Sequence, residues 1–142
     1  MQIVFNLPHV YKFGSNRVDD SQTLEVLCES LIGLNMVYLQ NMKRRGHTVK
    51  PLYQAGVVYG RTEWWETIPA LYHRGYGDCK SLTCALIAEY RFQGIASNPV
   101  HRWTPNQYGS NDFHILVELK NGFEDPSRKL GMGRNENARI NI

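Results

Sequence analysis

The chain has 142 residues, of which 42% are hydrophobic and 20% charged. This composition is typical of one globular domain that buries its own core, and it excludes an intrinsically disordered chain. The formal net charge is only +3. Lys43-Arg44-Arg45 is its one basic cluster, which we interpret as the last turn of a helix and not as a nucleic-acid patch. No apolar run reaches the ~18 residues of a membrane span, and residues 1–6 lack the pattern of a signal peptide, so we expect a soluble domain over residues 1–142.

The first half of the chain predicts one short strand and one long helix. Residues 2–5 are β-like. From Gln22 to about Arg45, apolar residues recur at helical spacing, after Asp20 or Ser21 as a cap and before Gly46 as a stop. They are Leu24, Leu27, Leu31, Leu34, Tyr38 and Met42. Extended or irregular backbone is expected over 52–60, and a short helix over 64–71.

The second half predicts a helix followed by strands. Gly75 and Gly77 interrupt what precedes Asp78, which can cap a helix that runs to about Gly94. Strands are expected over 95–103 and 113–120, with His114 on the face of the second strand that points away from the core. Asn121-Gly122 predicts a hairpin turn, and the return strand ends before Pro126. Helices followed by strands indicate an α+β fold.

Three cysteines leave at least one thiol unpaired. Cys28 lies among apolar residues and is interpreted as core. Cys79 and Cys84 are about 140° apart around a helix, so they cannot converge on one metal, and we predict neither a metal site nor a cofactor. Cys79 occupies the first turn of its helix, where the helix dipole and unpaired N–H groups favour a thiolate. The alternative is a cysteine that is simply buried at a helix start.

The run Gly77-Asp78-Cys79, the later Gly94-Ile95, a strand that opens with His114, and then Asp125-Pro126-Ser127 resemble the transglutaminase-like branch of the papain-like superfamily. The resemblance covers about residues 57–127. It implies a papain-like core over about 52–130, in which the Cys79 helix packs on an antiparallel sheet. It also implies a catalytic triad, with Cys79 as nucleophile, His114 as general base and Asp125 as the carboxylate that orients the histidine. The segment Glu124 to Arg128 is also similar to the ends of small proteins in tailed-phage genomes that consist of this domain alone.

The mechanism that this resemblance implies is attack of Cys79 on an amide or peptide carbonyl, with His114 first taking and then returning the proton. The Cys79 N–H would be one oxyanion donor. Family members take the second donor from a side chain upstream of the cysteine. Gln54 is the candidate here, with Trp64 and Trp65 as alternatives.

Two features leave the histidine and its partner open. A strict two-residue turn at Asn121-Gly122 would put Asp125 opposite Glu118, four residues along the strand from His114, or about 13 Å. A bulge or twist could shorten that distance, or Asn111 or Asp112 could orient the histidine instead. His101, in the preceding strand, is the rival base.

Three functions follow from these patterns. The first is a cysteine protease or amidase on a protein or peptide substrate, with hydrolysis favoured over cross-linking because no site for a second substrate is evident. The second is a structural or adaptor protein on the same fold, for example a virion component in contact with other virion proteins. The third, nucleic-acid binding, rests only on residues 43–45 and the small positive charge.

Overall fold

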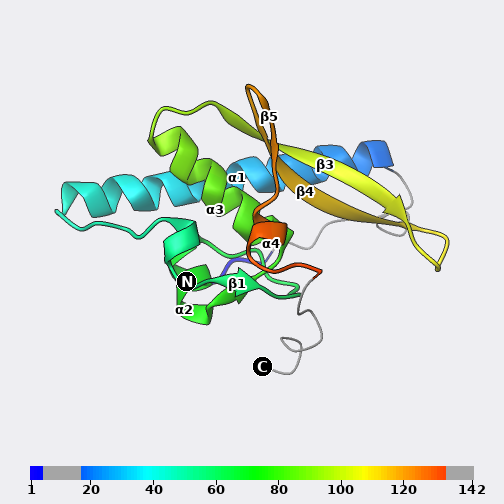
Figure 1. The fold of residues 1–142 in the computed structure, drawn as a ribbon, viewed down its shortest axis with the longest axis horizontal. Helices are drawn as coiled ribbons and strands as arrows, with labels where there is room; N and C mark the ends of the chain where they lie inside the picture. Colours follow the sequence, from blue (N-terminus) through cyan, green and yellow to red (C-terminus); the bar gives the residue numbers. More distant parts are fainter. Residues whose placement is uncertain (5–16, 134–142) are drawn as a thin grey trace.

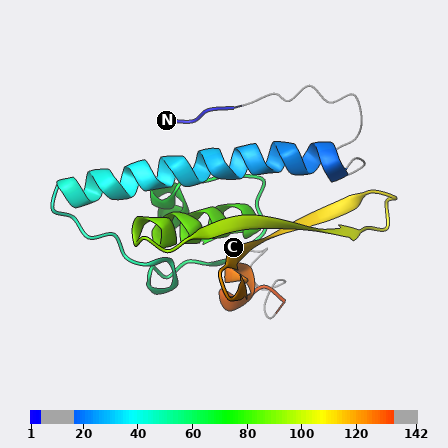
Figure 2. The ribbon, with the colours of Figure 1, turned by 90° about the horizontal axis from the view of Figure 1, so that it is seen from above.

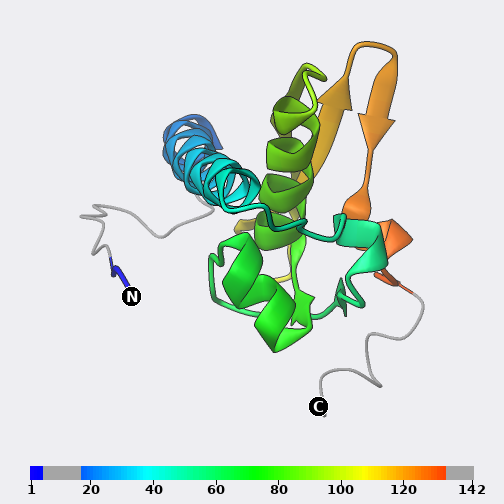
Figure 3. The ribbon, with the colours of Figure 1, turned by 90° about the vertical axis from the view of Figure 1, so that its left-hand side faces the viewer.

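The computed structural model describes residues 1–4 and 17–133. Three layers of secondary structure make up the fold, with helix α3 between helix α1 and an antiparallel sheet (Figure 3). Buried apolar side chains from all three layers form one core cluster, which includes Ile32, Leu82, Ile115 and Val117. The protein is therefore an α+β domain with a helix packed on an antiparallel sheet, as predicted.

Helix α1 spans Arg17–Arg44 and runs along the length of α3 and of the hairpin formed by strands β3 (Ser97–Pro105) and β4 (Asn111–Leu119) (Figure 2). Its buried stripe differs from the predicted one, because Leu34 is 55% exposed and Asn35 is fully buried. Asn35 is tolerated in the core because its Oδ1 accepts a hydrogen bond from the amide of Ile68, at 2.8 Å. Near the helix start, Trp103 Nε1 donates to Ser21 Oγ at 2.9 Å and fastens α1 to the sheet.

Two short helices and two short strands lie between α1 and α3 in the chain (Figure 1). The 3₁₀ helix η1 spans Leu52–Gln54 and α2 spans Ile68–Arg74. Strand β1, Val58–Tyr59, pairs in parallel with β2, Tyr76–Gly77. Strand β2 ends at Gly77, two residues before the first residue of α3, so this pairing fixes where α3 begins. Residues 2–4 lie in no helix or strand, and residue 5 of the predicted strand lies outside the described residues.

Helix α3 spans Cys79–Phe92 and begins where its sequence predicts. Asp78 caps it by accepting the amide of Lys80 at 3.2 Å. Every residue from Cys79 to Ala88 is buried, so the helix is covered by neighbours on several sides. A helix in this position can present its first turn to the sheet on one side while α1 covers the other.

The sheet has the order β3-β4-β5, with β3 over Ser97–Pro105, β4 over Asn111–Leu119 and β5 over Gly122–Glu124. Leu119 pairs with Gly122, so the turn consists of Lys120 and Asn121. The expected Asn121-Gly122 turn is wrong because it requires a positive φ at Asn121, whereas no described residue other than glycine has a positive φ. Gly122, with φ of 147°, is instead the first residue of β5. Helix α4, Pro126–Lys129, follows at once.

Candidate active site

His114 and Asp125 are in direct contact. Nε2 of His114 lies 2.9 Å from Oδ2 of Asp125. The separation of about 13 Å that a strict Asn121-Gly122 turn would give does not occur, because the observed turn shifts the register by two residues. Val117 pairs with Glu124, so Asp125 comes next to Leu116 and is a diagonal neighbour of His114 on the same face.

The contact between His114 and Asp125 determines which ring nitrogen of the imidazole can act as a base. A carboxylate accepts hydrogen bonds, so Nε2 is the nitrogen that donates, and in the neutral imidazole Nδ1 keeps its lone pair. Asp125 is itself held from the other side, since its Oδ1 accepts the amide of Arg128 at 3.2 Å and thereby caps α4. The imidazole is thus oriented with Nδ1 available to act as a base.

Cys79 reaches the same strand through Ile115. The backbone amide of Ile115 hydrogen-bonds the Cys79 thiol, and one turn later Thr83 Oγ1 donates to the Ile115 carbonyl at 3.0 Å. The N–H and C=O of one residue in a strand point to the same edge. Since β5 pairs only with Leu119 to Val117, the edge of β4 at Ile115 is open to α3. The thiol therefore lies beside the peptide group that joins His114 to Ile115.

The first turn of α3 also holds the loop before α2. Lys80, a buried lysine, donates from Nζ to the Thr62 carbonyl at 2.9 Å and forms an ion pair with Asp78. Ser81 Oγ accepts the amide of Glu66 at 3.0 Å and donates to the Trp64 carbonyl at 3.3 Å. The two residues after Cys79 therefore fix the segment that contains both candidate tryptophans.

The sequence alone did not single out Lys80, Ser81 or Thr83 as residues that position the site. Only the spacing of four residues from Cys79 to Thr83, which places both side chains on one face of the helix, could have indicated the last of these. Trp64 is 51% exposed, while Trp65 packs against the core cluster. Among the loop side chains, Trp64 is thus available to a substrate.

Gln54 makes no side-chain hydrogen bond to Cys79, His114 or Asp125 among the described residues. It is an exposed residue at the end of η1, and Leu52 at the start of η1 donates its amide to Glu89 Oε2 at 2.9 Å. Glu89 lies ten residues beyond Cys79, or about 15 Å along the helix axis. The structure gives no support to Gln54 as the second oxyanion donor.

The environment of Cys79 does not favour a thiolate. Burial, followed by the charge of Asp78, raises the pKa of the Cys79 thiol to about 12, and the Ile115 amide and Lys80 only partly oppose this. The expectation that the helix start lowers this pKa is wrong for the structure, because burial and the Asp78 charge outweigh the Ile115 amide and Lys80. Just before this helix, a Cβ at Gly77 would lie 2.6 Å from Leu71 Cδ1, so glycine at this position leaves room for the buried Leu71 side chain.

His101, the alternative candidate for the base, contacts Cys28 and not Cys79. Its Nε2 lies 3.8 Å from Sγ of Cys28, and Cys84 Sγ lies 3.7 Å from the carbonyl of Cys28. The neighbouring Cys84 thiol and His101 lower the pKa of Cys28 to about 6 despite burial. Cys28 is core, as predicted, with an exposed fraction of 0%.

Within residues 1–4 and 17–133, no three or more His, Cys, Asp or Glu side chains are grouped so that they could hold a metal ion. Of the described helices, none combines the length and the apolar character that a bilayer-crossing helix needs. Comparison with protein-family models, with curated proteins and with solved structures gave no match for this chain. Functional inference therefore depends on the geometry of Cys79, His114 and Asp125.

Proposed function

We propose that the protein is a cysteine-dependent acyl-transfer enzyme that hydrolyses amide or peptide bonds, with a transglutaminase-like, papain-like active site. The observation that carries this proposal is the contact of 2.9 Å between His114 Nε2 and Asp125 Oδ2, on the strand whose next amide hydrogen-bonds Cys79. An imidazole oriented by a carboxylate, on the residue next to the amide that bonds a helix-start cysteine, supports nucleophilic catalysis by a thiol.

The raised pKa of Cys79 determines the order of steps. The thiol is protonated at rest, so Nδ1 of His114 takes the thiol proton as Sγ attacks the substrate carbonyl. The tetrahedral intermediate collapses to a thioester while His114 protonates the leaving amine. Water then attacks the thioester, which releases the acid and restores the thiol. The Cys79 N–H has no partner within α3 because it is at the helix start, and it can face the oxyanion.

Alkylation with iodoacetamide, followed by mass spectrometry of the peptides, tests the proposal. Cys79 should react first because it is 8% exposed and His114 can take its proton. Cys28 has the lower pKa, about 6, but Cys28 and Cys84 are both 0% exposed, so the reagent does not reach them. A His114→Ala variant should slow the reaction at Cys79 and leave the other two cysteines unchanged. Equal and slow labelling of all three cysteines in the unmodified protein would contradict the proposal.

A non-catalytic role as a structural or adaptor protein, for example in a phage particle, is the second candidate. The burial of Cys79 and the raised pKa of its thiol favour it. A Cys79→Ala variant separates the two functions. If particles assemble and infect normally with this variant, the structural role stands; if assembly proceeds and only a cleavage step is lost, the enzyme stands.

A further inference from the structure

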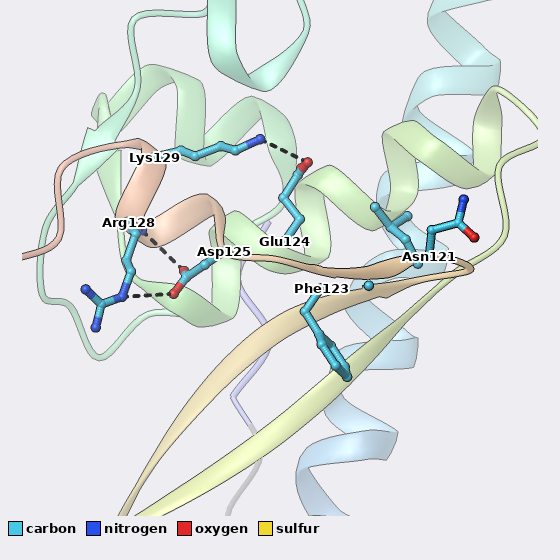
Figure 4. Close-up of a pocket in the computed structure, with 8 residues that line it drawn as sticks. Asn121, Phe123, Glu124, Asp125, Arg128 and Lys129 are labelled. Atoms are coloured by element: carbon cyan, nitrogen blue, oxygen red, sulfur yellow. Dashed lines mark hydrogen bonds and ion pairs between the residues drawn. The ribbon is translucent and has the colours of Figure 1, made fainter.

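A groove of about 410 Å³ begins at Asp125 and follows the free edge of strand β5. Leu119, Phe123, Arg128 and Lys129 are among the residues that line it (Figure 4). Asp125 is shared between this groove and the contact with His114. A chain segment that occupied the groove would therefore lie next to the proposed catalytic centre.

The formal charges of the groove lining balance, with Glu124 and Asp125 against Arg128 and Lys129, so the ligand that it prefers depends on which of these groups remain accessible. The Glu124 carboxylate is occupied, since it accepts the hydroxyls of Tyr90 at 2.9 Å and Tyr53 at 3.1 Å and pairs with Lys129 at 3.1 Å. Asp125 is likewise occupied by His114 and the Arg128 amide. Both carboxylates are thus neutralised or bonded within the protein.

Arg128 is the more exposed of the two cations, since the Lys129 side chain is 55% exposed. The Arg128 side chain is 74% exposed and contacts Asp125 only through Nε, at 3.6 Å. Its terminal nitrogens form no ion pair with any other described residue, and Figure 4 shows them directed away from Asp125. A guanidinium with free terminal nitrogens binds carboxylates in a bidentate manner.

The edge of β5 offers backbone groups as well. Ile115 directs its N–H and C=O groups to the edge of β4 that faces α3, which is also the β5 side. Alternate residues of a strand share an edge, so residues 117 and 119 direct their N–H and C=O groups to the same side. Leu119–Gly122 and Val117–Glu124 are therefore the hydrogen-bonded pairs, and Phe123 points its own N–H and C=O at the groove. Its side chain, 56% exposed, lies on the face of His114 with the Arg102 guanidinium 5.1 Å from the ring centre.

We propose that this groove binds an extended, acidic peptide segment, which pairs with the β5 edge at Phe123 and places a carboxylate on Arg128. Addition of a strand to an exposed edge supplies main-chain hydrogen bonds, and the cation supplies selectivity. The inference rests on the proposed function, since the bound segment is the substrate of Cys79 in that function.

Fluorescence anisotropy with the Cys79→Ala protein, which cannot turn the peptide over, tests the proposal. The probes are labelled peptides that differ only in carrying Glu, Gln or Lys at two positions. The Glu peptide should bind about tenfold more tightly than the Lys peptide. Arg128→Gln should abolish that preference, whereas Arg45→Gln, which removes the same charge from an exposed position after α1, should preserve it. Equal affinity for Glu and Lys peptides, or a preference that survives in Arg128→Gln, would overturn the assignment.

Strand addition is tested with the same protein and a Glu peptide methylated at alternate backbone nitrogens. Methylation in one of the two alternating registers should weaken binding about tenfold, and no effect in either register would overturn strand pairing. A single-stranded oligonucleotide that bound better than the Glu peptide would likewise overturn the peptide assignment. Fast alkylation of Cys79 without any peptide preference would contradict only this inference, while slow alkylation with intact preference would contradict only the proposed chemistry.

Discussion

Thr83 donates its hydroxyl to the carbonyl of Ile115 at 3.0 Å, and both residues are completely buried. The backbone amide of the same Ile115 donates a hydrogen bond to the Cys79 thiol. Ile115 is therefore hydrogen-bonded by two side chains, Cys79 and Thr83, from successive turns of α3. This double contact sets the position of Cys79 relative to His114, and it can form only because β5 ends before it reaches that part of the edge.

Replacing Thr83 with valine keeps the shape of the side chain and removes the donor. We expect Thr83→Val to lower the free energy of unfolding by about 1–3 kcal/mol, because a buried carbonyl loses its partner, and to change the alkylation rate of Cys79. Thr104→Val, at an exposed position of β3, should stay within about 0.5 kcal/mol of the unmodified protein. Urea unfolding and labelling kinetics measure both. Unchanged stability and labelling in Thr83→Val would show that the contact does not position the site.

The Asp125→Asn variant tests the tautomer of His114. Asparagine caps helices about as well as aspartate, so α4 and overall stability should change little. The amide presents an alternative donor to Nε2, so the Nε2-protonated form should lose its predominance in ¹⁵N-resolved NMR spectra of the imidazole. Any hydrolytic activity should fall by on the order of 10²–10⁴. If Nε2 remained protonated to the same extent, the carboxylate would not be what orients the ring.

Glu124 lies directly before Asp125 and ties it to α3 and η1 through the hydroxyls of Tyr90 and Tyr53. Glu124→Ala should reduce stability by about 2–4 kcal/mol through loss of these charge-assisted bonds. Burial, followed by the bond to Glu124 and its charge, raises the pKa of Tyr90 to about 12. Ultraviolet titration of the variant should therefore detect ionisation at lower pH. Lys129→Ala, which leaves the Glu124 carboxylate in place, should leave the ionisation of Tyr90 at the same alkaline pH as in the unmodified protein.

The thiol of Cys79 should make the fold sensitive to alkali. Its pKa is about 12 in the folded protein and 9.0 as the ordinary value, so its contribution is complete below about pH 9 and is lost as pH rises towards 12. The loss amounts to about 1.4 kcal/mol per pH unit in that window. Urea unfolding between about pH 8 and pH 10 should show a steeper decline for the unmodified protein than for Cys79→Ser. Parallel declines would mean that the thiol is hydrated.

Much of the fold could be predicted from local pattern. The glycines before Asp78 and the alternation along 113–119 locate α3 and β4 within two residues, because capping and periodicity are short-range effects. For α1 the end is predicted within one residue, but the helix already includes Asp20 and Ser21, the expected caps, and its buried stripe is rotated to include Asn35. A partner far away in the sequence, the amide of Ile68, makes that polar residue acceptable in the core.

The site depends on both levels. Local sequence alone was enough to place Cys79 at a helix start and His114 on the outer face of a strand. Tertiary structure decided the rest: a turn at Lys120 and Asn121 brought Asp125 to His114, and the packing of α3 raised the pKa of the Cys79 thiol. Register and desolvation depend on contacts between segments that are distant in the chain, and no local pattern encodes them.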